Sequence, residues 1–145
     1  MDDKMMADEN SQKNSIVNAQ DLSKAFSGFK AVNGIDFSVN SQECLGFLGP
    51  NGAGKTTLIR MISCFLEPSG GTLEVFGKRT DRFARFIKTN IGVCPQEDNL
   101  DPDLKVLDNL RFFARYFDII GESANLRNVE LLEFMGLLHK KRRAD

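Results

Sequence analysis

This chain of 145 residues has no long hydrophobic run, only three cysteines and a single histidine. No apolar stretch approaches the ~18–20 residues that a membrane-spanning helix needs. The cysteine count is odd and no cysteine stands in a CxxC pair, which argues against a disulfide framework and a zinc site. The formal net charge is only −1, so no overall field draws the chain to nucleic acid or to an anionic membrane.

The composition is that of a globular protein, with 41% hydrophobic and 27% charged residues. Residues 1–15 are acidic and polar without an apolar core, so we expect a disordered leader and not a secretory signal. Residues 16–145 have the length of one domain. The cysteines lie in apolar stretches, which predicts buried free thiols at Cys44, Cys64 and Cys94.

Hydrophobic periodicity predicts mainly strands in the first part of the chain and helices in the last part. We expect strands at residues 16–26, 31–39, 44–48, 72–76 and 91–95. We expect helices at residues 55–65, 82–88, 106–117 and 122–138. The segments 44–48 and 91–95 are short, nearly continuous apolar runs, a pattern typical of strands buried on both faces.

A glycine-rich loop at residues 49–57 is the sharpest motif, because its sequence GPNGAGKTT fits G-x-x-x-x-G-K-[ST]. A strand is expected before it and a helix after it. Glycines let successive N–H groups converge on one anion, and the helix N-terminus adds partial positive charge. The candidate binding residues are Asn51, Gly52, Ala53, Gly54, Lys55, Thr56 and Thr57.

Within this loop, Lys55 and Thr56 have distinct expected roles. The lysine reaches the β- and γ-phosphates of a nucleoside triphosphate as a point charge, and the threonine hydroxyl is placed to ligate Mg²⁺. The alternative interpretation is a glycine-rich helix entry that binds nothing. The full motif and its flanking elements favour nucleotide binding.

Residues 48–58, LGPNGAGKTTL, strongly resemble the Walker A region of ABC-transporter ATP-binding domains. Residues 22–26, 31–37, 68–77 and 91–96 resemble neighbouring segments of the same family, so the resemblance extends from Ile16 to about Leu138. It implies an α/β fold with a P-loop NTPase core and an antiparallel β subdomain in residues 16–99. Residues 100–145 would begin a helical subdomain. ATP and Mg²⁺ are the cofactors that the resemblance implies.

The resemblance also assigns roles to Phe26 and Gln96. Phe26 matches the aromatic residue that stacks on adenine, where the family usually has tyrosine. Gln96 matches the Q-loop glutamine, which contacts Mg²⁺ or the attacking water, so Lys55 and Gln96 are the candidate catalytic residues. The alternatives are that Phe26 is a core residue and that Gln96 is an ordinary solvated side chain.

Residues 95–101, 108–110 and 114–117 resemble the branch that contains daunorubicin-type drug exporters and nodulation lipo-oligosaccharide exporters. That branch usually has threonine where this chain has Lys105. A lysine cannot accept amide hydrogens at a helix N-terminus, so we expect Asp103 to cap the helix that follows.

The family also has a signature motif, a Walker B aspartate with a following glutamate, and a switch histidine, and none is found in these 145 residues. His139 lacks the switch context, and residues 140–143 are expected to be a solvated helix terminus. We therefore expect the chain alone not to turn over ATP.

The resemblance implies the ATP-binding subunit of an exporter, peripheral at the cytoplasmic face of the membrane. Its expected partners are a transmembrane permease subunit and a second ATP-binding subunit. Two alternatives stay open: a truncated fragment that at most binds nucleotide, and a non-transport ABC protein.

Overall fold

The computed structural model of this chain describes residues 15–96 and 100–140. The predicted leader lies outside the described residues except for Ser15, as do residues 141–143 of the basic run. The residues group into two compact units, one extending to Val93 and the other starting at Cys94. None of the helices within the described ranges is long and apolar enough to cross a membrane.

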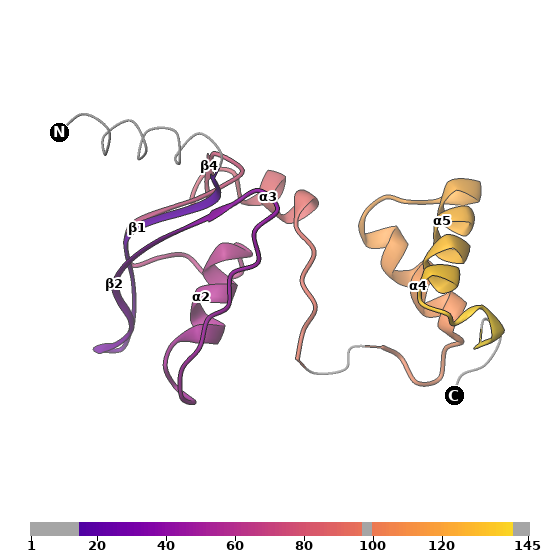
Figure 1. Cartoon of the computed structure of the whole chain (residues 1–145), viewed down its shortest axis with the longest axis horizontal. Helices are drawn as coiled ribbons and strands as arrows, with labels where there is room; N and C mark the ends of the chain where they lie inside the picture. The colour runs from indigo at the N-terminus through magenta and orange to yellow at the C-terminus, as the bar shows by residue number, and fades with distance from the viewer. Residues whose placement is uncertain (1–14, 97–99, 141–145) are drawn as a thin grey trace. The chain divides into compact units, whose positions relative to one another are not determined.

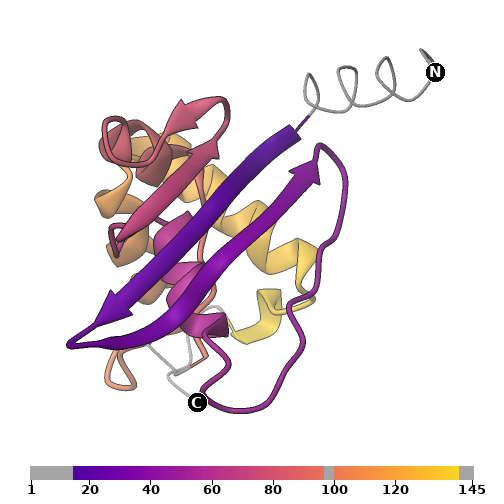
Figure 2. The same cartoon turned by 90° about the vertical axis from the view of Figure 1, so that its left-hand side faces the viewer.

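The first unit is built on an antiparallel sheet whose strand order is β2-β1-β3-β4. The strands are β1 (Ser15–Phe26), β2 (Phe29–Asn40), β3 (Gly70–Val75) and β4 (Lys78–Arg79). Strands β1 and β2 form a hairpin through Ser27 and Gly28, which both have positive φ, as two-residue hairpin turns require. The sheet and the hairpin confirm the antiparallel β subdomain (Figure 2).

A hydrophobic core forms where helices α2 (Lys55–Ile62) and α3 (Ala84–Asn90) pack on this sheet. Figures 1 and 2 show α2 against one face of the sheet, behind β1 and β2. Leu58 and Met61 of α2 and Ile87 of α3 are buried, as are Leu22 and Val75 of the strands. The core therefore fixes the start of α2, which carries the candidate loop residues, against the sheet.

Helix α2 ends three residues earlier than predicted, because a residue just after it adopts a left-handed backbone conformation. Cys64 has a φ of 58°, and the N–H groups of Phe65 and Leu66 both donate to the carbonyl of Arg60. Such a left-handed residue satisfies the last carbonyls of a helix and stops it.

The strands predicted at 44–48 and 91–95 are wrong, because neither segment pairs with a strand of the described residues. A short apolar run predicts burial, but a strand also needs a neighbour for its N–H and C=O groups. In the first segment, Leu48 is 97% exposed, while Phe47 packs edge-to-face on Phe37 with ring centroids 5.4 Å apart.

The prediction of buried thiols is wrong for the same reason, since Cys44 and Cys94 lie in these two unpaired segments and are exposed. Cys64, which follows α2, is half-buried. Its burial raises the pKa of the thiol, and the nearby Lys88 ammonium opposes part of that rise. A raised pKa lowers the fraction of reactive thiolate that Cys64 carries at neutral pH.

The second unit contains helices α4 (Val106–Tyr116) and α5 (Gly121–Phe134) and the 3₁₀ turn η1 (Leu138–Lys140). The helices predicted at 106–117 and 122–138 are confirmed, although α5 ends earlier. Gly136 has a φ of 67°, and the N–H of Leu137 donates to the carbonyl of Leu132, which closes the helix.

The prediction that Asp103 caps α4 is wrong, because Lys105 is the N-cap residue and no side chain caps the helix. Buried Asn109 ties the preceding loop to α4 instead. Its Nδ2 donates to the carbonyls of Asp101 and Leu104 at 2.9 and 3.3 Å, and its Oδ1 accepts from the N–H of Asp101 at 2.9 Å. The Asn109 amide therefore fixes the loop before α4, while the first N–H groups of the helix have no side-chain cap.

Candidate functional site

The loop before α2 folds as a tight glycine turn held against strand β2. Gly52 and Gly54 have φ values of 85° and 87°, in the left-handed region that favours glycine. A Cβ atom on Gly54 would lie 2.3 Å from the carbonyl oxygen of Ala31 in β2. Gly54 is therefore required both for the turn and for the close approach of loop and sheet.

The Lys55 ammonium closes the loop from the inside. Its Nζ donates to the carbonyl oxygens of Gly49 and Pro50, both at 2.7 Å, and the residue is half-buried. The flexible side chain is thus held over the loop by two neutral acceptors. An anionic oxygen would compete well for it, because the ammonium is attracted to a full negative charge more strongly than to a neutral carbonyl dipole.

No side chain caps the N-terminus of α2, and no acidic side chain lies in its first turn. The N-cap residue of this helix is Gly54. The amide groups and the partial positive charge of the helix end therefore face the loop without an internal anion. Thr56 is exposed and Thr57 is half-buried, so the Thr56 hydroxyl is open to solvent.

The outer part of the loop is also open to solvent. Asn51, Gly52 and Ala53 are all exposed, and the N–H of Ala53 donates to the carbonyl of Pro50 at 3.2 Å. The structure therefore brings Lys55 to the loop backbone and leaves the loop face free. The anion cradle that the motif predicts at this loop stays a prediction.

Phe26 lies at the end of β1, next to the hairpin turn. Its ring is 45% exposed, it is not part of the hydrophobic core cluster, and the Lys24 Nζ lies 5.3 Å from the ring centroid. The alternative that Phe26 is a core residue does not hold. Gln96 belongs to the second unit and is exposed, and its predicted role stays a prediction.

Comparison with known proteins identifies the family. Residues 32–145 match the sequence profile described as ABC transporter. The chain belongs to the ABC transporter ATP-binding family. Relatives named Nod factor export ATP-binding protein I are 41% identical over 124 residues in Burkholderia lata and 42% identical over 125 residues in Ralstonia nicotianae. Both alignments cover 86% of this chain, and they cover 41% and 39% of the relatives, so the chain spans about two fifths of their length.

Solved structures of ABC ATP-binding subunits share the fold. The chain is similar to cbiO1 from Clostridium perfringens, described as part of the ABC transporter complex cbiONQ, with a TM-score of 0.75 and 26% identity. That match covers 90% of this chain and 54% of cbiO1. A second structure, the ATP-binding subunit of an ABC transporter, has a TM-score of 0.73 at 24% identity, covering 88% of this chain and 53% of the other. The fold class, a P-loop NTPase core with an antiparallel β subdomain, is confirmed.

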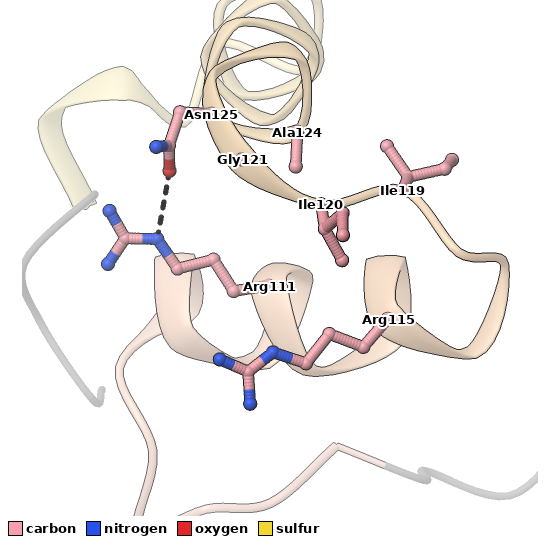
Figure 3. Close-up of a pocket in the computed structure, with 7 residues that line it drawn as sticks. All are labelled: Arg111, Arg115, Ile119, Ile120, Gly121, Ala124 and Asn125. Atoms are coloured by element: carbon pink, nitrogen blue, oxygen red, sulfur yellow. Dashed lines mark hydrogen bonds between the residues drawn. The ribbon is translucent and has the colours of Figure 1, made fainter.

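A pocket of about 390 Å³ in the second unit was not predicted from the sequence of this ABC family member. Figure 3 shows Arg111 and Arg115 projecting from α4, with the Arg111 guanidinium directed at Asn125, while Ile120 and Ala124 line the pocket from the segment above α4. The Nε of Arg111 donates to the Oδ1 of Asn125 at 3.1 Å. The spacing of the two arginines, four residues apart on one helix, was the signal that could have indicated a shared face.

Proposed function

We propose that residues 16–145 belong to an ATP-binding domain in which the loop at 49–57 holds the phosphates of ATP. Residues 16–99 supply the P-loop and the sheet, and residues 100–145 belong to the helical part. The geometry of Lys55 carries this proposal, because its ammonium is already held at the loop by two carbonyl oxygens at 2.7 Å. When phosphates enter, the ammonium exchanges these neutral acceptors for anionic oxygens.

The other site residues act around the same nucleotide in this proposal. Thr56 would ligate Mg²⁺ through its exposed hydroxyl, and the proposed role of Gln96 is a contact to Mg²⁺ or to the attacking water. The loop residues Asn51, Gly52 and Thr57 would present backbone N–H groups to the phosphates, and Ala53 would do so after its N–H leaves the carbonyl of Pro50. Bound Mg²⁺ would neutralise the negative charge that develops on the phosphate oxygens during phosphoryl transfer.

We further propose that the chain is part of an exporter's ATP-binding subunit at the inner face of the cell membrane. It would couple ATP binding and hydrolysis to transport through a membrane permease, together with a second ATP-binding subunit. The names of its relatives, export ATP-binding proteins, support this role.

Co-purification from detergent-solubilised membranes tests the transport role. The affinity-tagged full chain, expressed in its native organism, should co-purify with a polytopic membrane protein. The Lys55→Ala variant should co-purify with the same amount of it. Recovery with ribosomes in place of a membrane protein would contradict the exporter assignment and favour a non-transport role.

Replacing Phe26 with alanine should weaken ATP binding by roughly 10-fold, because aromatic stacking on a base contributes about 1–3 kcal/mol. Phe26→Tyr keeps the stacking face and should bind ATP as the wild type does. Titration with a fluorescent ATP analogue measures both. Phe29→Ala is the matched control, since Phe29 is 64% exposed in the same hairpin. Equal losses in the Phe26→Ala and Phe29→Ala variants would contradict adenine stacking at Phe26.

A further inference from the structure

The segment from Lys78 to Lys88 has a strong local positive charge. It contains five cations and one anion, a local charge of +4, although the whole chain carries −1. Arg79 pairs with Asp81, with Nη2 and Oδ2 2.8 Å apart, so these two charges offset each other. The other cations are Lys78, Arg82, Arg85 and Lys88. None of these four forms an ion pair with a carboxylate of the described residues.

Helix α3 exposes its two cationic side chains to solvent. Ile87 is fully buried in the core, which fixes the inner face of the helix. With 3.6 residues per turn, Arg85 lies on the opposite face, and Phe86 and Lys88 lie on its two flanks. Phe86 is 46% exposed, and Arg85 and Lys88 are exposed as well. The core therefore orients a cationic and aromatic face toward solvent.

Strand β4 and the turn after it extend this face. The N–H groups of Arg82 and Phe83 donate to the carbonyl of Arg79 at 3.2 and 3.0 Å, which folds α3 back beside β4. Both views show β4 and α3 side by side (Figures 1 and 2). We call this surface the α3 patch. It consists of Lys78, Arg82, Arg85, Phe86 and Lys88.

Exposed aromatic rings surround these cations. The Nζ of Lys78 lies 5.3 Å from the centroid of Phe83, and the Nζ of Lys88 lies 4.9 Å from the centroid of Phe65. These rings are 45% and 67% exposed. Surfaces that rest on anionic lipid combine cations for the headgroup phosphates with aromatic rings that enter the interface.

We propose that the α3 patch binds anionic phospholipid headgroups and so holds this unit against an acidic membrane surface. The inference rests on the proposed function in one respect, because a transporter subunit works next to a membrane. The four cations of the patch lie on β4, on the turn after it and on α3, and none of them has an ion-pair partner among the described residues. A compact group of cations of this kind suits contact with lipid headgroups. Single-stranded nucleic acid is bound along a charged groove that follows an extended backbone, whereas the cations of the α3 patch all lie within the eleven residues from Lys78 to Lys88.

Vesicle flotation of the full chain tests this proposal. The wild type should bind vesicles of phosphatidylcholine with phosphatidylglycerol and should not bind vesicles of phosphatidylcholine alone. The Arg82→Gln/Arg85→Gln variant should partition roughly 25-fold more weakly, since each cation at an anionic surface contributes about fivefold in affinity. The matched control is Lys105→Gln/Arg127→Gln, which loses two exposed cations of the other unit and should partition as the wild type does.

A second pair of variants tests the aromatic part of the patch. Phe86→Ala should weaken binding at raised salt, where screening reduces the electrostatic share of the affinity. Phe134→Ala, which removes an 87% exposed ring of α5, should have no effect. Circular dichroism and ATP affinity, measured on every variant, should stay at wild-type values.

Three results would overturn the proposal. They are equal binding to both kinds of vesicle, equal losses in the patch variant and its charge-matched control, and displacement of the protein from vesicles by single-stranded RNA. A wild type that binds anionic vesicles through the patch but does not bind ATP would contradict the proposed function and leave the lipid site standing.

Discussion

The Lys55→Ala variant should bind ATP about 100-fold more weakly than the wild type, because charge-assisted hydrogen bonds contribute about 1.5–3 kcal/mol each. In the structure, the Lys55 ammonium is held at the loop through the carbonyls of Gly49 and Pro50. The ammonium is therefore already close to where the phosphates would bind, and the lysine side chain loses little conformational entropy on binding. Titration with a fluorescent ATP analogue at fixed Mg²⁺ measures the loss.

Arg60→Ala is the control for this variant. Arg60 is an exposed cation of the same helix, and its removal lowers the net charge equally without touching the loop. ATP affinity should be unchanged in Arg60→Ala, and both variants should melt as cooperatively as the wild type. If Lys55→Ala bound ATP as tightly as Arg60→Ala, the loop would not be the phosphate site.

The Gly54→Ala variant should lose at least about 3 kcal/mol of unfolding free energy, and ATP binding with it. A left-handed conformation costs an L-residue roughly 1–2 kcal/mol, and here the new methyl group also meets the backbone of β2. The Cβ atom would lie 2.3 Å from the Ala31 carbonyl oxygen, so loop and sheet would have to separate. Urea denaturation followed by circular dichroism measures the free energy.

Gly52→Ala separates the clash from the conformational cost. Gly52 has nearly the same φ, 85°, but a Cβ atom there would have no neighbour within 4 Å. Its cost should be the conformational part alone, about 1–2 kcal/mol. Equal destabilisation by the two substitutions would show that the approach of the loop to β2 does not constrain Gly54.

The parts of the fold that were predicted correctly depend on local sequence. The strands predicted at 16–26 and 31–39 and the helix predicted at 106–117 follow from apolar periodicity within each segment. The glycine loop is specified by its own residues in the same way, so its place before a helix could be read directly. For these elements, the nearest neighbours in the sequence determine the backbone.

The failures concern features that depend on distant partners. Residues 44–48 and 91–95 have the composition of buried strands, but a strand forms only where another strand pairs with it. The exposure of Cys44 and Cys94 follows from the same missing pairing. The helix expected to be capped by Asp103 has no side-chain cap, and Asn109 holds the loop before it by reaching back eight residues to Asp101, a contact that propensity at the helix start does not indicate.

The α3 patch was not predicted for a related reason. Its cations are visible in the sequence, but a charged segment is most often an ordinary solvated face. The burial of Ile87 shows which side of the helix faces outward. The ion pair with Asp81 offsets the charge of Arg79, whereas Arg85 has no ion-pair partner among the described residues. Orientation and pairing are tertiary properties.

Calorimetric titration of the full chain with ATP, with and without Mg²⁺, tests the central claim most directly. We expect saturable binding of one ATP per chain below about 1 mM, the upper range of typical enzyme substrate constants, with weaker binding when Mg²⁺ is removed. A cooperatively folded chain that binds no ATP in this range would contradict the assignment of the loop at 49–57 as a nucleotide site.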